Sequence, residues 1–300
     1  RCLIGGASKW KPGLVLQKEL EVDGKVVKLE ARYITKEEDS FIIEFNWRGG
    51  HSFAEVLHVA GNMPLPPYIK RKAEGEDAAR YQTVFAEHNG SVAAPTAALH
   101  FTERVFKGLE EKGISRSYIT LHVGAGTFKP VKSETIAEHT MHAESFVVTA
   151  ETLQTLLKVE TIVAVGTTSL RTLESLHWLG LKLLMNKGLT DFTLGQWEAY
   201  DLIGQPFTYK QSIEALYYYL QQKGETKMWC RTSLLIMPGY RFQSVKALVT
   251  NFHQPRSTLL LLVAAFIGDD WKKVYDHAME KDYRFLSYGD SSLLYRPLSP

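Results

Sequence analysis

Two imidazoles and one carboxylate lie within six residues of this sequence, at His139, His142 and Glu144. These side chains are common proton donors and acceptors in enzymes, and all three types are also zinc ligands. The segment has no His-Glu-x-x-His pattern and no second ligand cluster at helical spacing. Three interpretations stay open on these residues alone: proton transfer or substrate contact, a purely structural role, and a metal-dependent hydrolase that uses all three side chains.

A second polar segment, Gly-Thr-Thr-Ser-Leu-Arg over residues 166–171, follows a short apolar strand and opens a helix. Backbone N–H groups at a helix start suit a carboxylate, a phosphate or a ribose hydroxyl. The hydroxyls of Thr167 and Thr168 and the guanidinium of Arg171 fit the same ligands. Threonine and serine are also good N-caps, and plain capping explains their presence equally well.

A glycine-containing loop over residues 122–130 follows another strand. Gly124 and Gly126 would let the backbone approach a ligand closely. The loop fails the dinucleotide fingerprint, because Lys129 occupies the third glycine position and Pro130 follows it. We interpret it as a ligand loop of another kind or as a tight turn.

Two further polar clusters follow strands near the end of the chain. Residues 250–258 close a strand and open a helix, which is where α/β folds place ligands. Residues 288–290 read Tyr-Gly-Asp, and Asp290 suits either a catalytic carboxylate or a turn cap.

The elements that must position these residues fall into two regions. Residues 1–62 read as antiparallel β, with strands over 14–22 and 25–34 around Asp23-Gly24, a dipeptide that favours a hairpin turn, and a third strand over 40–47. We expect a small antiparallel β-barrel there, partial in this chain. Three prolines within residues 64–67 mark the boundary.

Residues 63–300 alternate between helical and strand patterns, which predicts a layered α/β catalytic domain. A capping box at Thr208 and Gln211 starts a helix that ends near Lys223. The other expected helices cover 102–113, 167–179, 257–268 and the segment from 269. The expected strands cover 117–123, 146–148, 161–165, 233–237, 245–250 and 283–288.

Bulk composition excludes little. The net charge of +2 neither requires nor excludes nucleic acid, and two distant cysteines form no disulfide framework, which fits a reducing cytoplasm. The longest apolar run, 259–267, is too short to span a bilayer. The chain begins at Arg1 and enters strand-like sequence at once, so we expect it to be a fragment.

Several long motifs, in order, resemble one family, the S-adenosylmethionine:tRNA ribosyltransferase-isomerases. The similarity runs from residue 61 to 290 and includes the segments at 61–70, 80–86, 92–102, 121–131, 141–144, 165–175, 250–259 and 283–290. Residues 1–60 resemble the family's small β-barrel in outline only. The family's lead α/β segment, which precedes the barrel, is absent here.

The resemblance implies the reaction. The ribosyl part of S-adenosylmethionine moves to a 7-aminomethyl-7-deazaguanine base at the tRNA wobble position, which gives epoxyqueuosine and releases adenine and methionine. The implied partners are S-adenosylmethionine as co-substrate and a tRNA anticodon loop, with no metal, no membrane and a cytoplasmic location. Splayed bases stack on aromatic side chains; the candidates here, equally suited to core packing, are Tyr81, Phe101, Phe128 and Tyr288.

A sulfonium acidifies its neighbouring C–H bonds, so a base could remove the ribose C5′ proton, and an acid is then needed at adenine. The catalytic candidates are His142, Glu144, His253 and Asp290. Arg171 with Thr167 and Thr168 would hold the methionine carboxylate. The remaining substrate-binding candidates are Thr96, His100, Gly124, Gly126, Thr127, Asn251 and Tyr288. The loops 95–101, 122–130, 141–144, 166–171, 250–258 and 287–290 are expected to form one pocket.

Two departures from the family pattern favour a second hypothesis. The usual aspartate before the Pro-Gly-Tyr turn is Ser233 here, and the segment 195–231 is longer than usual. The alternative is a divergent sibling that binds S-adenosylmethionine or RNA without this transfer.

Overall fold

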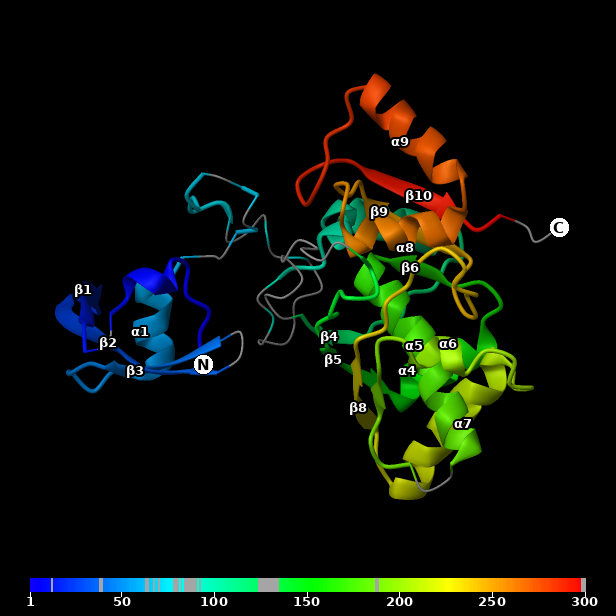
Figure 1. Ribbon diagram of the computed structural model, residues 1–300, viewed down its shortest axis with the longest axis horizontal. Coiled ribbons are helices and arrows are strands. Elements are labelled where there is room, and N and C mark those ends of the chain that lie inside the picture. The colour runs from blue at the N-terminus through cyan, green and yellow to red at the C-terminus, as the bar shows by residue number, and fades with distance from the viewer. Residues whose placement is uncertain are drawn as a thin grey trace. The chain divides into compact units, whose positions relative to one another are not determined.

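The computed structural model divides into two compact units, residues 1–64 with 71–73 and residues 65–70 with 74–300 (Figure 1). The division lies close to the boundary expected after residue 62. The structure describes residues 1–11, 13–37, 40–62, 65–66, 68–69, 71–77, 81, 83, 91, 93–123, 135–186 and 189–297.

The smaller unit is an antiparallel sheet with one helix on it. Its strands follow the order β1 (Val15–Val22), β2 (Lys25–Glu37) and β3 (Ser40–Asn46), after a short 3-10 helix η1 (Ala7–Lys9). The predicted hairpin is confirmed: Val22 pairs with Lys25, and Asp23 and Gly24 have φ of 49° and 71°. Positive φ at both turn residues matches the twist of the flanking strands.

The described residues do not confirm the β-barrel expected over 1–62. Their sheet is open, with β1 and β3 at its edges, and three strands are too few to close around a core. One face is instead covered by helix α1 (Phe53–Ala60), which the sequence reading missed. Ser52 and Glu55 form a capping box at its start, and Val56 packs with Leu20, Val22 and Val27.

The larger unit contains two sheets around one long helix, so the expected α/β class is confirmed. A four-stranded sheet has the order β4 (Thr120–His122), β5 (Glu144–Thr149), β8 (Lys227–Thr232), β7 (Thr193–Leu194). A three-stranded sheet has the order β10 (Ser291–Tyr295), β9 (Ala247–Asn251), β6 (Val163–Val165). Strands β6 and β9 run parallel, and β10 runs antiparallel to β9.

Helix α5 (Thr167–Met185) forms the centre of the core. It is buried on nearly every side and contacts β6, β7, β9 and helix α7. Leu170, Leu176 and Leu179 have no exposed surface. The described residues of this unit also form η2 (Thr96–His100), α3 (Glu103–Glu111), α4 (Ala150–Lys158), α6 (Glu198–Asp201), α7 (Tyr209–Lys223), α8 (Thr258–Ile267) and α9 (Asp270–Glu280).

Two predicted strands are wrong. Residues 233–237 form an irregular segment after β8, and residues 283–288 form turns before β10. Leu286 has φ of 71°, which a strand does not allow, and its N–H bonds to Phe252 O. Leu234, Leu235 and Ile236 of the first stretch are buried in the core, and Phe285 of the second packs against it. Burial of this kind does not require strand pairing.

The segment 195–231, read as an insertion, is part of the core. It supplies α6, α7 and nearly all of β8, the strand that joins β5 to β7. The predicted capping box of α7 is present, with Thr208 Oγ1 accepting from Gln211 N. The larger unit therefore could not fold without this segment.

Candidate active site

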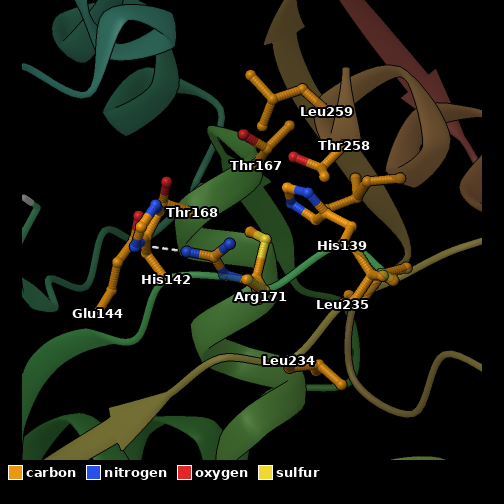
Figure 2. A pocket seen from close by; sticks show the side chains of 13 residues that line it. His139, His142, Glu144, Thr167, Thr168, Arg171, Leu234, Leu235, Thr258 and Leu259 are labelled. Carbon is orange, nitrogen blue, oxygen red and sulfur yellow. Dashed lines mark hydrogen bonds and ion pairs between the residues drawn. The ribbon is translucent and has the colours of Figure 1, made fainter. Parts of the chain in front are cut away.

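A cavity in the larger unit lies where β5 and α5 begin (Figure 2). The segment before β5 forms one wall, the first turn of α5 a second, and the residues after β8 with the start of α8 a third. The cavity is lined by His139, Met141, His142, Glu144, Thr167, Thr168, Arg171, Leu234, Leu235, Ile236, Thr258, Leu259 and Leu262.

The first turn of α5 offers backbone donors to this cavity. Gly166 has φ of 94° and ψ of 146°, a conformation that favours glycine, and it lets the chain turn from β6 into the helix. Its N–H bonds to Val249 O of β9 at 2.8 Å, which fixes the turn. The N-cap residue, Gly166, makes no side-chain capping bond, so the first N–H groups, beside Thr167 and Thr168, receive no cap from it and can bind an acceptor.

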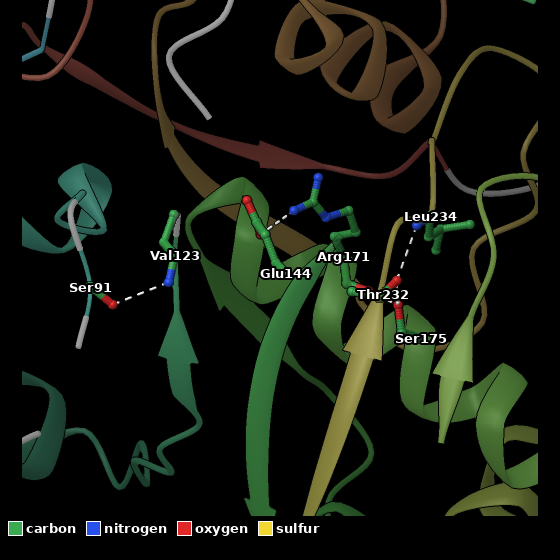
Figure 3. A network of polar contacts seen from close by, with 7 residues as sticks. All are labelled: Ser91, Val123, Glu144, Arg171, Ser175, Thr232 and Leu234. Carbon is green, nitrogen blue, oxygen red and sulfur yellow. Dashed lines mark hydrogen bonds and ion pairs between the residues drawn. The ribbon is translucent and has the colours of Figure 1, made fainter. Parts of the chain in front are cut away.

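A buried ion pair joins the two main walls. Arg171 Nη2 donates to Glu144 Oε2, and the two side chains are only 7% and 10% exposed (Figure 3). Arg171 Nε is buried without a hydrogen-bond partner in the structure. The guanidinium therefore has one buried donor without a partner, on a side chain that lines the cavity.

A hydroxyl network below this pair connects α5 with β8. Ser175 Oγ lies 2.7 Å from Arg171 O and 2.8 Å from Thr232 Oγ1. Thr232 Oγ1 in turn accepts from Leu234 N at 3.1 Å (Figure 3). The apolar wall at Leu234 is thus held in register with the turn of α5 that carries Arg171.

The two histidines come from the irregular segment before β5. Burial, and to a smaller extent the nearby His142, lower the pKa of His139 below its ordinary value. His139 is therefore neutral at pH 7 and can accept a proton. In Figure 2 its imidazole lies near Thr258, while His142 lies near Glu144 and Thr168.

Gln196 fixes this histidine segment in place. Its side-chain amide donates to His139 O at 2.7 Å and accepts from Met141 N at 2.8 Å. Its backbone carbonyl accepts from Leu235 N at 3.2 Å. One residue thus holds two cavity walls. The sequence reading missed it, because a glutamine in a turn carries no chemical signal of its own.

The sequence reading also missed the apolar wall at Leu234, Leu235 and Ile236, which it assigned to a strand. Ser233, the departure from the family pattern, points elsewhere: its N–H donates to Leu194 O at 3.0 Å, and it does not line the cavity.

A second polar group gathers around Asn251, at the end of β9. Its side-chain oxygen lies 3.1 Å from Thr96 Oγ1, and its amide nitrogen lies 3.1 Å from His100 Nε2 and 3.5 Å from Asp290 O. These four predicted site residues are together, but none of them lines the cavity.

The Asp290 carboxylate caps the turn that precedes it. It accepts from Arg284 N at 2.7 Å, and this bond, with the Arg284 guanidinium and His100, lowers its pKa. Gly289 is required beside it, since a Cβ would lie 2.3 Å from Arg284 O. The geometry is that of the turn-cap interpretation.

His253 is buried behind the strand end. Its Nε2 lies 2.9 Å from Thr250 Oγ1, and its N–H donates to Tyr275 Oη at 2.9 Å. Burial lowers the pKa of His253 to about 4. It does not line the cavity.

The aromatic candidates have different surroundings. Tyr288 Oη donates to Asp77 Oδ1 at 3.2 Å, and its ring packs 5.9 Å from that of buried Tyr81. Phe101 stacks on Phe106. Gly124, Gly126, Thr127 and Phe128 lie outside the described residues.

A family model described as queuosine biosynthesis protein matches residues 1–294. The chain belongs to this family. It is 40% identical over 298 residues to the S-adenosylmethionine:tRNA ribosyltransferase-isomerase of Rhodospirillum rubrum, an alignment that covers 98% of this chain and 72% of that protein. Proteins of the same name from Mesorhizobium japonicum and Rhizobium leguminosarum are 44% and 42% identical.

The alignments to the last two relatives cover 81% and 82% of this chain but only 57% and 56% of those proteins. The chain thus spans little more than half of their length. A crystal structure of S-adenosylmethionine tRNA ribosyltransferase from Thermotoga maritima is similar at a TM-score of 0.42 and 23% identity, covering 92% of this chain and 77% of that one.

Membrane-spanning helices or metal-binding clusters in the described part of the chain would indicate other functions. No helix there is long and apolar enough to cross a membrane. No group of three or more histidine, cysteine or acidic side chains there is arranged to hold a metal ion, so the hydrolase interpretation of His139, His142 and Glu144 gains no support.

Proposed function

We propose that this chain forms the catalytic part of an S-adenosylmethionine:tRNA ribosyltransferase-isomerase. The enzyme would transfer and isomerise the ribosyl group of S-adenosylmethionine onto 7-aminomethyl-7-deazaguanine at the tRNA wobble position. The products are epoxyqueuosine in tRNA, adenine and methionine. The membership in the queuosine family carries this proposal, and the relatives' names favour it over a non-catalytic sibling. A cytoplasmic location, where tRNA is modified, is part of the proposal.

The cavity suits the parts of S-adenosylmethionine. The methionine carboxylate would bind at the start of α5, where free backbone donors, Thr167 and Thr168 converge. Arg171, which also lines the cavity, would add a positive charge near that carboxylate. The apolar wall formed by Leu234 and Leu259 would exclude water from the adenosyl portion.

Two histidines divide the proton transfers. Neutral His139 would take the proton from ribose C5′, leaving its electron pair on the carbon beside the sulfonium, because the lowered pKa keeps its imidazole unprotonated at pH 7. His142 would donate a proton to the departing adenine. Glu144 would hold Arg171 in position rather than act as the base, since its carboxylate is already engaged with the guanidinium.

The remaining predicted residues would position these groups. His253 and Asp290 hold the end of β9 and the turn before β10, and Asn251 connects that strand with Thr96 and His100. We propose that this group keeps β9 and α8 in place and so fixes Thr258 in the cavity wall. The tRNA anticodon loop would deliver its base from solvent.

The test is adenine release from S-adenosylmethionine by the full-length protein, with and without tRNA that carries the precursor base. We expect release that depends on this tRNA, and loss of at least 100-fold in kcat for His139→Ala and for His142→Ala, the upper part of the range for general acid–base groups. Tyr218→Ala, at an exposed position of α7, serves as the control. Wild-type protein that releases no adenine with precursor tRNA refutes the function. Full activity in both histidine variants refutes the assignment of roles.

A further inference from the structure

The four-stranded sheet has one face that the mechanism above does not use. Residues opposite one another in the register share a face, so His122 lies with Ser145 and Arg231, and Val147 lies with Trp229. On β8, Lys227, Trp229 and Arg231 are exposed, while the alternate residues Met228, Cys230 and Thr232 are buried toward α5. The face with Trp229 is therefore the side opposite the core helix.

The centre of this face is a pair of stacked rings. The Trp229 indole and the His122 imidazole have centroids 4.9 Å apart and planes inclined by 19°. They come from β8 and β4, which β5 separates, so the two side chains reach across the intervening strand. This explains why Val147 is buried on an otherwise open face. Trp229 is nevertheless 59% exposed, so much of a large ring system remains available to a partner.

The charged strand residues of this face are all cationic, and a carboxylate at its edge, Asp191 before β7, accepts a hydrogen bond from Thr193 Oγ1. Lys227 and Arg231 flank Trp229 on the same strand, and neither forms an ion pair with a carboxylate in the described part of the chain. The other residues of this face on the described strands are valine, serine and threonine, apart from His122. Two cations around an exposed indole, with no carboxylate among the strand residues of this face, complement a phosphate backbone with unstacked bases.

The face also adjoins the proposed catalytic cavity. Strand β8 ends at Thr232, two residues before Leu234 of the cavity wall, and β5 begins at Glu144. Trp229 is three residues from the end of β8, which at about 3.3 Å per residue places it roughly 10 Å along the strand from that edge. The nucleotide next to a base bound in the cavity could therefore reach Trp229.

We propose that the face formed by His122, Lys227, Trp229 and Arg231 binds the single-stranded part of the RNA substrate. A base stacks on the Trp229 indole, and Lys227 and Arg231 contact the flanking phosphates. This inference rests on the proposed function, because it assigns the tRNA partner of that same reaction to a surface. The RNA is recognised here by stacking and charge, not by its sequence.

The experiment uses the full-length protein and measures KM separately for precursor tRNA and for S-adenosylmethionine. Trp229→Ala is expected to raise the KM for tRNA on the order of tenfold, with the KM for S-adenosylmethionine unchanged. Trp229→Phe keeps a stacking ring and should retain most of the affinity. Tyr218→Ala removes an aromatic side chain of similar exposure from α7, 55% against 59%, and should change neither KM.

A second variant tests the charges without altering the ring. In Lys227→Gln/Arg231→Gln the slope of log K for the anticodon stem-loop RNA against log salt concentration should shrink by about 1.4, from two single-strand phosphate contacts at roughly 0.7 each. An unchanged tRNA KM in Trp229→Ala together with an unchanged salt slope overturns the RNA face. A change in oligomeric mass with unaltered tRNA affinity also overturns it and assigns the face to a second copy of the chain.

The two proposals fail in different ways. A wild-type protein that releases no adenine refutes the reaction, and direct binding of the unmodified anticodon stem-loop then still tests the face. An active Trp229→Ala protein with wild-type tRNA KM, together with an unchanged salt slope in Lys227→Gln/Arg231→Gln, refutes the face and leaves the reaction standing.

Discussion

Replacing Arg171 with methionine should destabilise the larger unit strongly. Methionine keeps the length and much of the volume of the side chain but removes the guanidinium that pairs with Glu144. The Glu144 side chain is only 10% exposed, so solvent cannot take over the role of the guanidinium. Breaking a buried pair from one side typically costs about 3–5 kcal/mol.

At about 2–4 °C per kcal/mol for a unit of this size, the loss corresponds to a fall in Tm of roughly 6–20 °C. Removing both charges should have the opposite outcome. In Arg171→Met/Glu144→Leu no charge is left buried, and apolar replacement of a buried pair is often neutral or stabilising by about 1–4 kcal/mol. The double variant should therefore recover most or all of the stability lost in Arg171→Met.

Equilibrium urea unfolding of wild type, both single variants and the double variant gives the four corners of the cycle. Calorimetric titration with S-adenosylmethionine on the same proteins separates stability from function. We expect the double variant to be folded but unable to bind, because the methionine carboxylate has lost its guanidinium. A loss below about 1 kcal/mol in Arg171→Met, or no recovery in the double variant, would refute the view that the pair is a desolvated link between β5 and α5.

Three further changes test other parts of the structure. Gly180→Ala should cost about 1–3 kcal/mol, because its Cβ would lie 2.1 Å from Ser212 O where α5 crosses α7. Burial lowers the pKa of His177 to about 4, so the folded state keeps it neutral while the unfolded chain binds a proton below about pH 6.5. The contribution of His177 to the free energy of unfolding is fully present above pH 6.5 and falls by about 3 kcal/mol as the pH drops to 4. Urea unfolding of His177→Phe should no longer show this loss. Gln196→Met should lower kcat about 10- to 100-fold, because the segment that carries the catalytic histidines loses both of its side-chain bonds.

A control variant or measurement tests each of these three predictions. Gly108→Ala has open space around the added methyl and should stabilise α3 by about 0.5–1 kcal/mol; equal effects at Gly180 and Gly108 would contradict the packing argument. A pH dependence that persists unchanged in His177→Phe would assign the titration elsewhere. Gln211→Met removes a capping side chain from α7 and should lower stability without lowering kcat. An equal loss of kcat there would reduce the role of Gln196 to general stability.

Much of the fold follows from local sequence chemistry. The Asp23-Gly24 hairpin, the Thr208 capping box and the Ser257 cap of α8 were predictable because each depends on a few adjacent residues. The open sheet of the smaller unit was not predicted, because strand patterns do not state how many strands close a sheet. The buried residues Leu234, Leu235 and Ile236 of segment 233–237 show that burial alone does not distinguish a strand from an irregular packed segment.

In the candidate site too, some residues could be predicted from the local sequence, whereas others depend on contacts between distant segments. Glu144, Thr167, Thr168 and Arg171 were found because their residue types and positions next to a strand or helix start suggest chemistry. The engagement of Glu144 with Arg171 could not be read from the sequence, since it depends on the approach of β5 to α5, 27 residues apart. Gln196 was not found for the same reason, because its contacts are with backbone atoms of distant segments.

A crystal structure of the full-length protein with S-adenosylmethionine tests the central claim most directly. The account predicts the methionine carboxylate at the first turn of α5, beside Thr167 and Arg171, with ribose C5′ within hydrogen-bonding reach of the His139 imidazole. A ligand bound instead around Asn251 and Asp290, with the cavity at the start of α5 filled by protein or empty, would contradict it.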